Sequence, residues 1–233
     1  TVDQYKFCTS QPDAVEALAR NAIAWLDAHP DRNIVSIAPS DGQNFCRCPK
    51  CVQLIESDPH GLDSHTALIL KYYNDVAKIV ARQRPGKFVG GLVYGKTMYP
   101  PKTSITLEPN VLLGWAPLNY YGLGLYKPGY APEFESVASA WSKISPNLVY
   151  LNYLHWHRSE SEAPLAPSLS LLKLESPTLK KLGYLGQCQA GVNWASDGVT
   201  NYILAKQMWN ANVNVDALYN RSEEHTSELQ SQF

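Results

Sequence analysis

The chain has 233 residues, 45% of them hydrophobic and 18% charged, a balance typical of a globular domain with one sizeable core rather than a disordered chain. No apolar run approaches the roughly 20 residues needed to cross a bilayer, so no membrane span is expected. The net charge of −1 and the scattered positions of the 20 lysines and arginines argue against a nucleic-acid partner.

Strand and helix patterns alternate along the chain. Apolar residues fall on one helical face after Pro12, so Pro12–His29 is expected to be an amphipathic helix, with strands at Tyr5–Cys8 before it and Asn33–Ala38 after it. The pattern then predicts a helix near Ser64–Arg84, strands near Phe88–Tyr94 and Val111–Trp115, a helix near Glu133–Lys143, a strand at Leu148–Tyr153, a short helix near Pro177–Leu182, a strand at Tyr184–Gln187 and a helix at Val199–Trp209.

Six strands with mostly helical crossovers imply a parallel sheet, which can close into a barrel or form a doubly wound sheet. No Gly-x-Gly-x-x-Gly or phosphate-loop pattern follows any strand, which removes the commonest reason to choose the doubly wound form. Polar and aromatic residues instead follow the strand ends, where barrels build their active sites. The fold class expected is therefore α/β, a partial TIM-type (β/α)8 barrel with about six of eight strands.

The C-terminal segment differs from the rest of the chain. Arg221–Ser231 reads R-S-E-E-H-T-S-E-L-Q-S, which resembles the conceptual translation of a sequencing-library adapter and shows no apolar period. We therefore expect residues 1–220 to form the partial barrel, truncated at both ends, and residues 221–233 to be a disordered artefactual tail.

Cysteines give the strongest local signal. Cys46, Cys48 and Cys51 form a C-x-C-x-x-C knuckle, and Cys8 lies at the end of the strand expected to be its neighbour. These four thiols can complete a tetrahedral structural zinc site, with Cys188 left over. Two disulfides are the competing interpretation, because adjacent strand ends also bring thiols within bridging range.

Aromatic side chains are abundant, with six tryptophans and fourteen tyrosines. Flat amphipathic rings suit the faces of sugars, although most such rings fill cores. The rings placed near strand ends, and so expected to stack on sugar, are Trp115, Tyr120, Tyr121, Trp156 and Trp194.

Two blocks carry a family resemblance. Val35-Ser36-Ile37-Ala38-Pro39-Ser40-Asp41-Gly42 leading into the knuckle, and Asn193-Trp194-Ala195 through Met208-Trp209-Asn210, resemble a bacterial domain-of-unknown-function family of glycoside hydrolase-like TIM barrels found in polysaccharide degraders and related to alpha-glucuronidases. The resemblance implies that strands three to eight are present and that the protein is periplasmic or secreted. It also places Asp41 at the end of the fourth strand, where similar barrels hold their general acid.

Asp41 is accordingly the leading catalytic candidate, although Ser-Asp-Gly is also good turn chemistry. Glycoside hydrolysis normally needs a second carboxylate roughly 5 to 9 Å away. Glu160 and Asp197, in loops after the last two strands, are the possible partners.

Other polar residues near the strand ends could contact sugar. His155 and His157 could bind hydroxyl groups or carry protons. Asn152 and Gln187 stand where the resemblance leads one to expect acids, which argues against hydrolysis but leaves both as candidate sugar ligands.

Two functions follow from these residues. The first is a glycoside hydrolase-like enzyme acting on a complex polysaccharide or glycoconjugate, with Asp41 as acid. The second is a non-catalytic carbohydrate-binding barrel with a structural zinc knuckle, which the missing acids favour. A purely structural zinc module would leave the strand-end aromatic residues unexplained.

Overall fold

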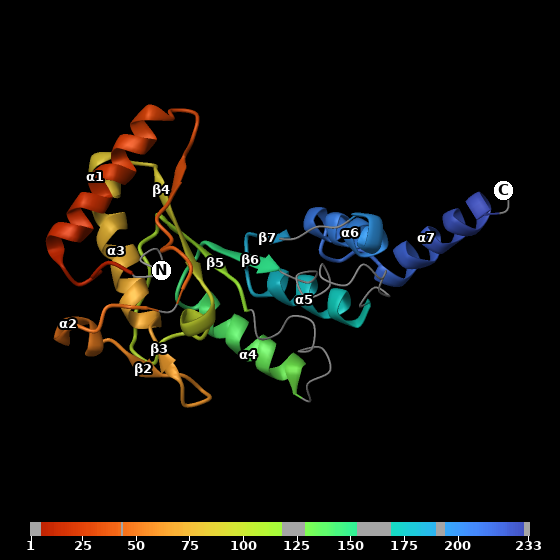
Figure 1. Ribbon diagram of the computed structural model, residues 1–233. Coiled ribbons are helices and arrows are strands. Elements are labelled where there is room, and N and C mark those ends of the chain that lie inside the picture. Colours follow the sequence, from red (N-terminus) through yellow and green to blue (C-terminus); the bar gives the residue numbers. More distant parts are fainter. Residues whose placement is uncertain (1–5, 43, 118–128, 153–168, 190–193, 231–233) are drawn as a thin grey trace. The chain divides into compact units, whose positions relative to one another are not determined.

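The computed structural model describes residues 6–42, 44–117, 129–152, 169–189 and 194–230, without the side chains of 194–197 and 223–230. The protein is a mixed α/β chain (Figure 1). Its helices are α1 (Pro12–Ala28), α2 (Pro49–Val52), α3 (Thr66–Gln83), α4 (Tyr130–Ser142), α5 (Leu169–Lys181), α6 (Trp194–Trp209) and α7 (Val215–Gln230), with a 3-10 turn η2 (Gly95–Thr97). Its strands are β1 (Ile34–Ser36), β2 (Glu56–Ser57), β3 (Asp63–Ser64), β4 (Phe88–Val93), β5 (Val111–Trp115), β6 (Leu148–Asn152) and β7 (Gly186–Gln189).

Five of the strands form one sheet in the order β1-β4-β5-β6-β7. The pairs β1/β4 and β4/β5 are parallel, with Val89 registered against Val35 on one side and Val111 on the other. The strands keep their chain order across the sheet, whereas a doubly wound sheet reverses its order at a switch point. A partial barrel is therefore consistent with this sheet.

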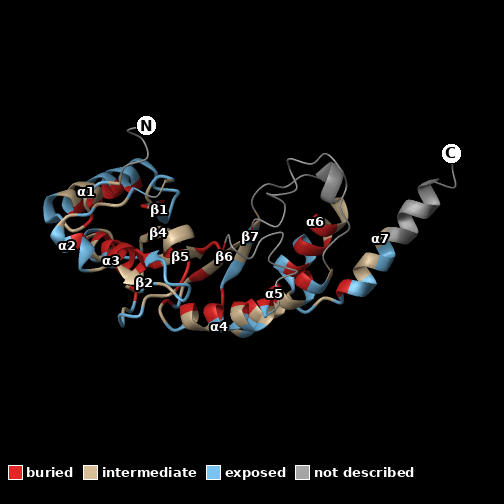
Figure 2. Ribbon diagram, turned by 60° about the horizontal axis from the view of Figure 1, so that its bottom comes forward, coloured by how far each residue is buried: buried red, intermediate tan, exposed pale blue. Residues whose placement is uncertain are grey.

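The chain divides into two compact units, residues 1–118 with 139–149 and residues 119–138 with 150–233. In the first unit, α1 and α3 pack against each other and against β1 and β4, and their inner faces are buried (Figure 2). The core includes Trp115 and Trp141, whose indole nitrogens both donate to the Met98 carbonyl at 3.0 Å. Because Trp115 ends β5 and Trp141 belongs to α4, these two hydrogen bonds hold Met98, the residue after η2, to both elements.

Tyr73 of α3 determines how closely that helix approaches the sheet. A Cβ atom added at Gly91 of β4 would lie 2.4 Å from the Tyr73 ring, so only glycine leaves room for the ring there. The Tyr73 hydroxyl donates to the Leu92 carbonyl at 2.9 Å and accepts from the Leu92 amide at 3.0 Å. An aromatic ring on the helix and a glycine on the strand thus lock α3 onto β4.

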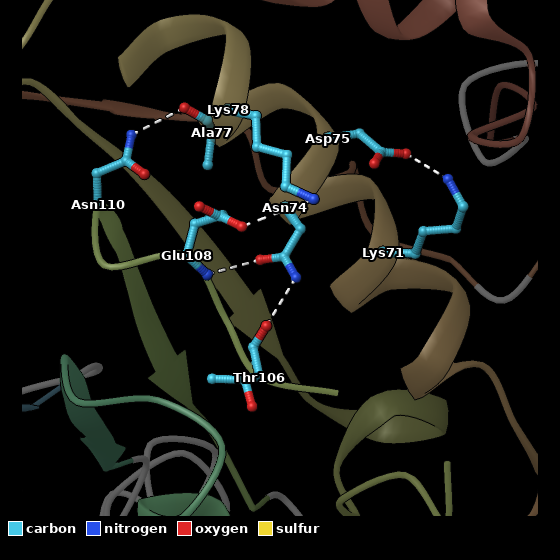
Figure 3. Close-up of polar contacts among 8 residues, drawn as sticks. All are labelled: Lys71, Asn74, Asp75, Ala77, Lys78, Thr106, Glu108 and Asn110. Atoms are coloured by element: carbon cyan, nitrogen blue, oxygen red, sulfur yellow. Dashed lines mark hydrogen bonds and ion pairs between the residues drawn. The ribbon is translucent and has the colours of Figure 1, made fainter. Parts of the chain in front are cut away.

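A polar contact also ties α3 to the segment before β5 (Figure 3). Asn74 donates from Nδ2 to the Thr106 carbonyl at 2.9 Å and accepts from the Glu108 amide at 2.8 Å. Asn110 donates to the Ala77 carbonyl at 3.0 Å. Two amide side chains therefore hold the irregular entry to β5 against one helix.

The second unit has its own core, in which Phe134, Tyr150, Leu172, Ile203 and Leu204 are buried. At its centre lies a buried carboxylate: Glu175 of α5 accepts hydrogen bonds from Tyr150 at 2.7 Å, Tyr130 at 2.9 Å and Asn152 at 3.2 Å. Three donors therefore satisfy a group that would otherwise be costly to bury.

Several sequence expectations are wrong in detail. The described part of Tyr5–Cys8 is not a strand, because the Lys6 amide bonds to the Asn44 carbonyl outside the five-stranded sheet. The helix expected to start at Pro177 begins at Leu169 and continues through the proline. Pro177 has no amide N–H to donate within the helix, but burial of one helix face stabilises it by more than that lost hydrogen bond. The buried positions are Leu171, Leu172, Glu175 and Leu179. Within the described residues, the segment after Asn220 belongs to α7 as far as Gln230, and its artefactual origin stays a prediction.

Candidate functional site

The four predicted cysteine ligands converge. Their sulfur atoms all lie within 4.8 Å of one another, which confirms that Cys8 meets the knuckle. Cys8 precedes α1, Cys46 lies in the loop after β1, Cys48 is the residue before α2, and Cys51 is fully buried within α2. Two loops and one short helix therefore bring the thiols together.

The distances fit a metal better than disulfides. Cys8 Sγ lies 3.6 Å from the sulfur atoms of both Cys48 and Cys51, and all four thiols are free. A tetrahedron with Zn–S bonds of about 2.3 Å has edges of about 3.8 Å, whereas a disulfide requires about 2.05 Å. Four soft ligands with no open position are those of a structural zinc site, so the residues present fit that ion.

A local hydrogen bond helps one of these thiols, Cys48, to ionise. A backbone hydrogen bond from Cys51 lowers the pKa of Cys48 to about 7, whereas burial raises the pKa of Cys51 to about 12. The Cys51 thiol donates to Ser10 Oγ at 3.2 Å, and this hydroxyl can turn to donate once the thiol ionises. A bound cation would supply the remaining stabilisation of the thiolates.

A second cluster lies at the carboxyl ends of β1 and β4, also in the first unit. Asp41 follows β1 in an exposed bend, and Gly42 completes the bend with φ of 104°. Tyr94, the residue after β4, donates from its hydroxyl to Asp41 Oδ1. Lys6 Nζ donates to the Asp41 carbonyl at 2.8 Å and lies 5.8 Å from the Phe45 ring centroid.

Asp41 therefore lies in a turn, as the Ser-Asp-Gly sequence suggested, and it is exposed after the end of β1. A narrow cavity of about 10 Å³ adjoins the cluster, lined in part by Lys6, Ser40 and Tyr94. That volume holds about one water molecule. The candidate site is therefore an exposed carboxylate beside a tyrosine. Its small cavity shares Pro39 and Ser40 with a larger open hollow of about 500 Å³, which Phe7 and Trp25 also line.

Three predicted sugar ligands lie elsewhere. Trp115 is fully buried with its indole bonded to Met98, so it is a core residue with no face open to a ligand. Asn152 is 1% exposed and bonds to Glu175, because it shares the buried side of β6 with Leu148 and Tyr150. Gln187 donates to Ser176 at 3.0 Å in the second unit.

The other candidates lie outside the described residues or side chains. Asp197 and Trp194 fall in the first turn of α6, rather than in a loop, and their side chains are not described. The remaining predicted residues outside the description are Tyr120, Tyr121, His155, Trp156, His157 and Glu160.

Comparison with known proteins identifies the family. The family model described as "Domain of unknown function (DUF4838)" matches residues 2–225. The chain belongs to this family. No curated protein and no solved structure matches the chain. Among the described helices of this DUF4838 chain, none is both long and apolar enough to cross a membrane.

Sequence reasoning missed three residues of chemical interest. Tyr94 could have been found as the residue that follows a strand next to the Asp41 strand. Glu175 could not, because its neighbours Tyr130 and Tyr150 are distant in sequence. Trp209 was assigned to a helix, yet its side chain is 94% exposed, which no periodicity signalled.

Proposed function

We propose that this DUF4838 chain forms part of a carbohydrate-active barrel of the glycoside hydrolase type, in which Asp41 is the carboxylate that acts on the sugar. The observation that carries the proposal is the Tyr94–Asp41 hydrogen bond, which joins the carboxyl ends of two paired parallel strands. Active sites of parallel barrels are built at this end from residues of different strands. A polysaccharide substrate would also place the protein in the periplasm or outside the cell.

The geometry leaves Asp41 available for a ligand. Tyr94 engages Oδ1, so Oδ2 can accept a sugar hydroxyl or, when protonated, donate to a glycosidic oxygen. Lys6 bonds to the backbone carbonyl of Asp41 rather than to its carboxylate, and so holds the bend without occupying the acid. The proposed zinc at Cys8, Cys46, Cys48 and Cys51 would hold the loop after β1 in place and would supply structural cross-linking only.

A second function, non-catalytic carbohydrate binding, is favoured by the residues on two other strands. Glycoside hydrolysis normally needs a second carboxylate, whereas Asn152 on β6 and Gln187 on β7 are amides. Asp41 with Tyr94 then accepts hydroxyl hydrogen bonds without cleaving the substrate.

Turnover separates the two functions. Hydrolysis of a panel of uronic-acid and amino-sugar glycosides would be measured for the wild type, Asp41→Asn and the matched surface control Asp31→Asn. If Asp41 is the general acid, D41N lowers kcat by roughly two to four orders of magnitude with sugar affinity nearly unchanged, and D31N has no effect. Equal turnover in D41N and wild type would remove Asp41 from the mechanism. Sugar binding without turnover in the wild type would support the binding function.

A further inference from the structure

A cavity of about 320 Å³ lies within the second unit, where neither the cysteine cluster nor Asp41 is found. It opens between the end of α5, the start of β7 and the segment that leaves α6. Its volume is at the low end of the range for small-molecule sites, which suits a ligand of monosaccharide size. Its lining combines apolar and hydrogen-bonding side chains.

The apolar side of the cavity is unusually exposed. Trp209, the last residue of α6, is 94% exposed, and Leu185 beside β7 is 60% exposed. A tryptophan ring offers a broad apolar face beside an N–H donor, and it is normally buried to a large extent. Trp209 is therefore available as a platform for a flat ligand ring.

The polar side carries two acceptors that lack donors. The Oε1 atoms of Gln187 and Gln207 are buried and have no hydrogen-bond partner among the described residues. Gln207 is 2% exposed, and its Nε2 donates to the Leu172 carbonyl at 2.8 Å. Because that partner is an acceptor, the amide cannot be turned over, and the unpaired atom must be the carbonyl oxygen.

Buried acceptors without donors are costly, and most are satisfied in native proteins. Both glutamines line the cavity, and their unpaired oxygens are buried in this structure. A ligand that enters with hydroxyl donors supplies the missing partners once a glutamine side chain turns its oxygen toward the cavity. Of the other polar lining residues, Ser176, Tyr184, Asn210 and Asn212 are neutral and can hydrogen-bond to such hydroxyls. Lys180 also lines the cavity, and its exposed ammonium can donate to hydroxyl or ring oxygens of the same ligand. The chemistry required is a small neutral ring with several O–H groups and an apolar face.

We propose that this cavity binds a neutral pyranose sugar, with its ring against Trp209 and its hydroxyls donating to Gln187 and Gln207. The proposal goes beyond the function assigned to Asp41 and shares no residue with it. It would stand as a separate sugar-binding site even if Asp41 proved inactive.

Titration of the whole chain with methyl β-glucopyranoside and methyl β-xylopyranoside, followed by tryptophan fluorescence and calorimetry, tests the site. Trp209→Ala should weaken binding about tenfold or more, whereas Trp209→Phe should stay within a few-fold of wild type. Trp25→Ala, at a 39% exposed tryptophan in the first unit, is the matched control and should bind like wild type.

Two further variants make the outcome decisive. Gln187→Leu should weaken binding several-fold, and Asp31→Asn, at an exposed carboxylate in the first unit, should leave this binding unchanged. An open-chain polyol such as sorbitol should bind more weakly than the methyl glycosides, because it has no ring to stack. No binding by wild type, equal affinity for sorbitol, or equal losses in W209A and W25A would overturn the proposal.

Discussion

At the scale of single residues, the cysteine cluster depends on charge. Four thiolates this close repel one another, and burial already raises the pKa of Cys51 to about 12. A bound cation offsets both the repulsion between the thiolates and the cost of burying the Cys51 thiolate, since metal binding and thiol deprotonation are coupled. The cluster is therefore expected to be stable with zinc and weakened without it.

Zinc content tests this directly. Cys48→Ser and Cys51→Ser should each lower bound zinc from about one ion per chain to a small fraction, measured by mass spectrometry of the purified protein. A strong chelator should lower the melting temperature of wild type. Cys188→Ser is the control, because Cys188 is exposed and lies outside the cluster. Wild-type protein that lacks zinc and whose melting temperature falls on reduction would instead indicate disulfides.

The buried Glu175 predicts how the free energy of unfolding depends on pH. Burial raises the pKa of Glu175 from 4.5 to about 7, the three donated hydrogen bonds opposing this. Between these values the folded state binds more protons than the unfolded state, so this group's contribution to stability falls as pH rises from about 4.5 to about 7. Glu175→Gln should remove that decline, measured by urea unfolding across this pH range.

The free energy of unfolding of E175Q must be compared with that of wild type at each pH, because the pH dependence contributed by His65 is opposite to that of Glu175. Burial lowers the pKa of His65 to about 4, so its contribution falls as pH drops from 6.5 toward 4. The same charge change at the exposed Glu16, Glu16→Gln, serves as control. Parallel pH curves for wild type and E175Q would contradict the assignment.

At the scale of elements, the sequence predicted what depends on local pattern. The strand Val111–Trp115 was predicted to the residue, and α1 and α3 to within two residues, because their apolar periods are long and regular. The hairpin β2–β3 was missed, because two-residue strands carry no period. The side of β6 that holds Asn152 could not be predicted, since it depends on Glu175 from a later helix.

The candidate site likewise contains residues that local sequence spacing predicts and residues that only contacts distant in sequence define. Cysteine spacing predicted the cluster because three of its ligands are local in sequence. Trp115 was misassigned because its position at a strand end is shared by core and ligand-facing residues, and only its contact with Met98 decides between them. Tyr94 is marked only by its position after a strand, and Trp209 only by its place in the second block of family resemblance, so neither residue has a motif that indicates a contact.

The amide clamp between α3 and the entry to β5 can be tested as an element contact (Figure 3). Asn74→Ala removes a donor and an acceptor that serve the Thr106 carbonyl and the Glu108 amide. The loss should cost about 1–2 kcal/mol in the free energy of unfolding. Lys78→Ala is the control: it breaks only the exposed Lys78–Glu108 ion pair at 3.6 Å and should cost about 0.5 kcal/mol or less. Equal costs for the two variants would show that the clamp does not hold the segment.

At the scale of the whole molecule, the sheet order has a consequence for association. β1 stands at one end of the order β1-β4-β5-β6-β7, so within the described sheet it pairs only with β4. Unpaired strand edges with apolar side chains invite pairing with another chain, and native proteins often blunt such edges with lysine. Ile34 at the start of β1 is 38% exposed and places an apolar side chain on this edge strand.

Ile34→Lys should therefore reduce self-association of the chain without unfolding it. The lysine stem can keep the contact that the Ile34 side chain makes near Gly90, while its charge opposes a second chain at the edge. Sedimentation velocity across the micromolar range should show wild type associating with concentration and I34K remaining smaller at the same concentrations. Leu62→Lys, at a 67% exposed leucine in the turn between β2 and β3, is the matched control and should associate like wild type. A wild-type chain that stays monomeric, or equal association in I34K and wild type, would show that the β1 edge is already protected.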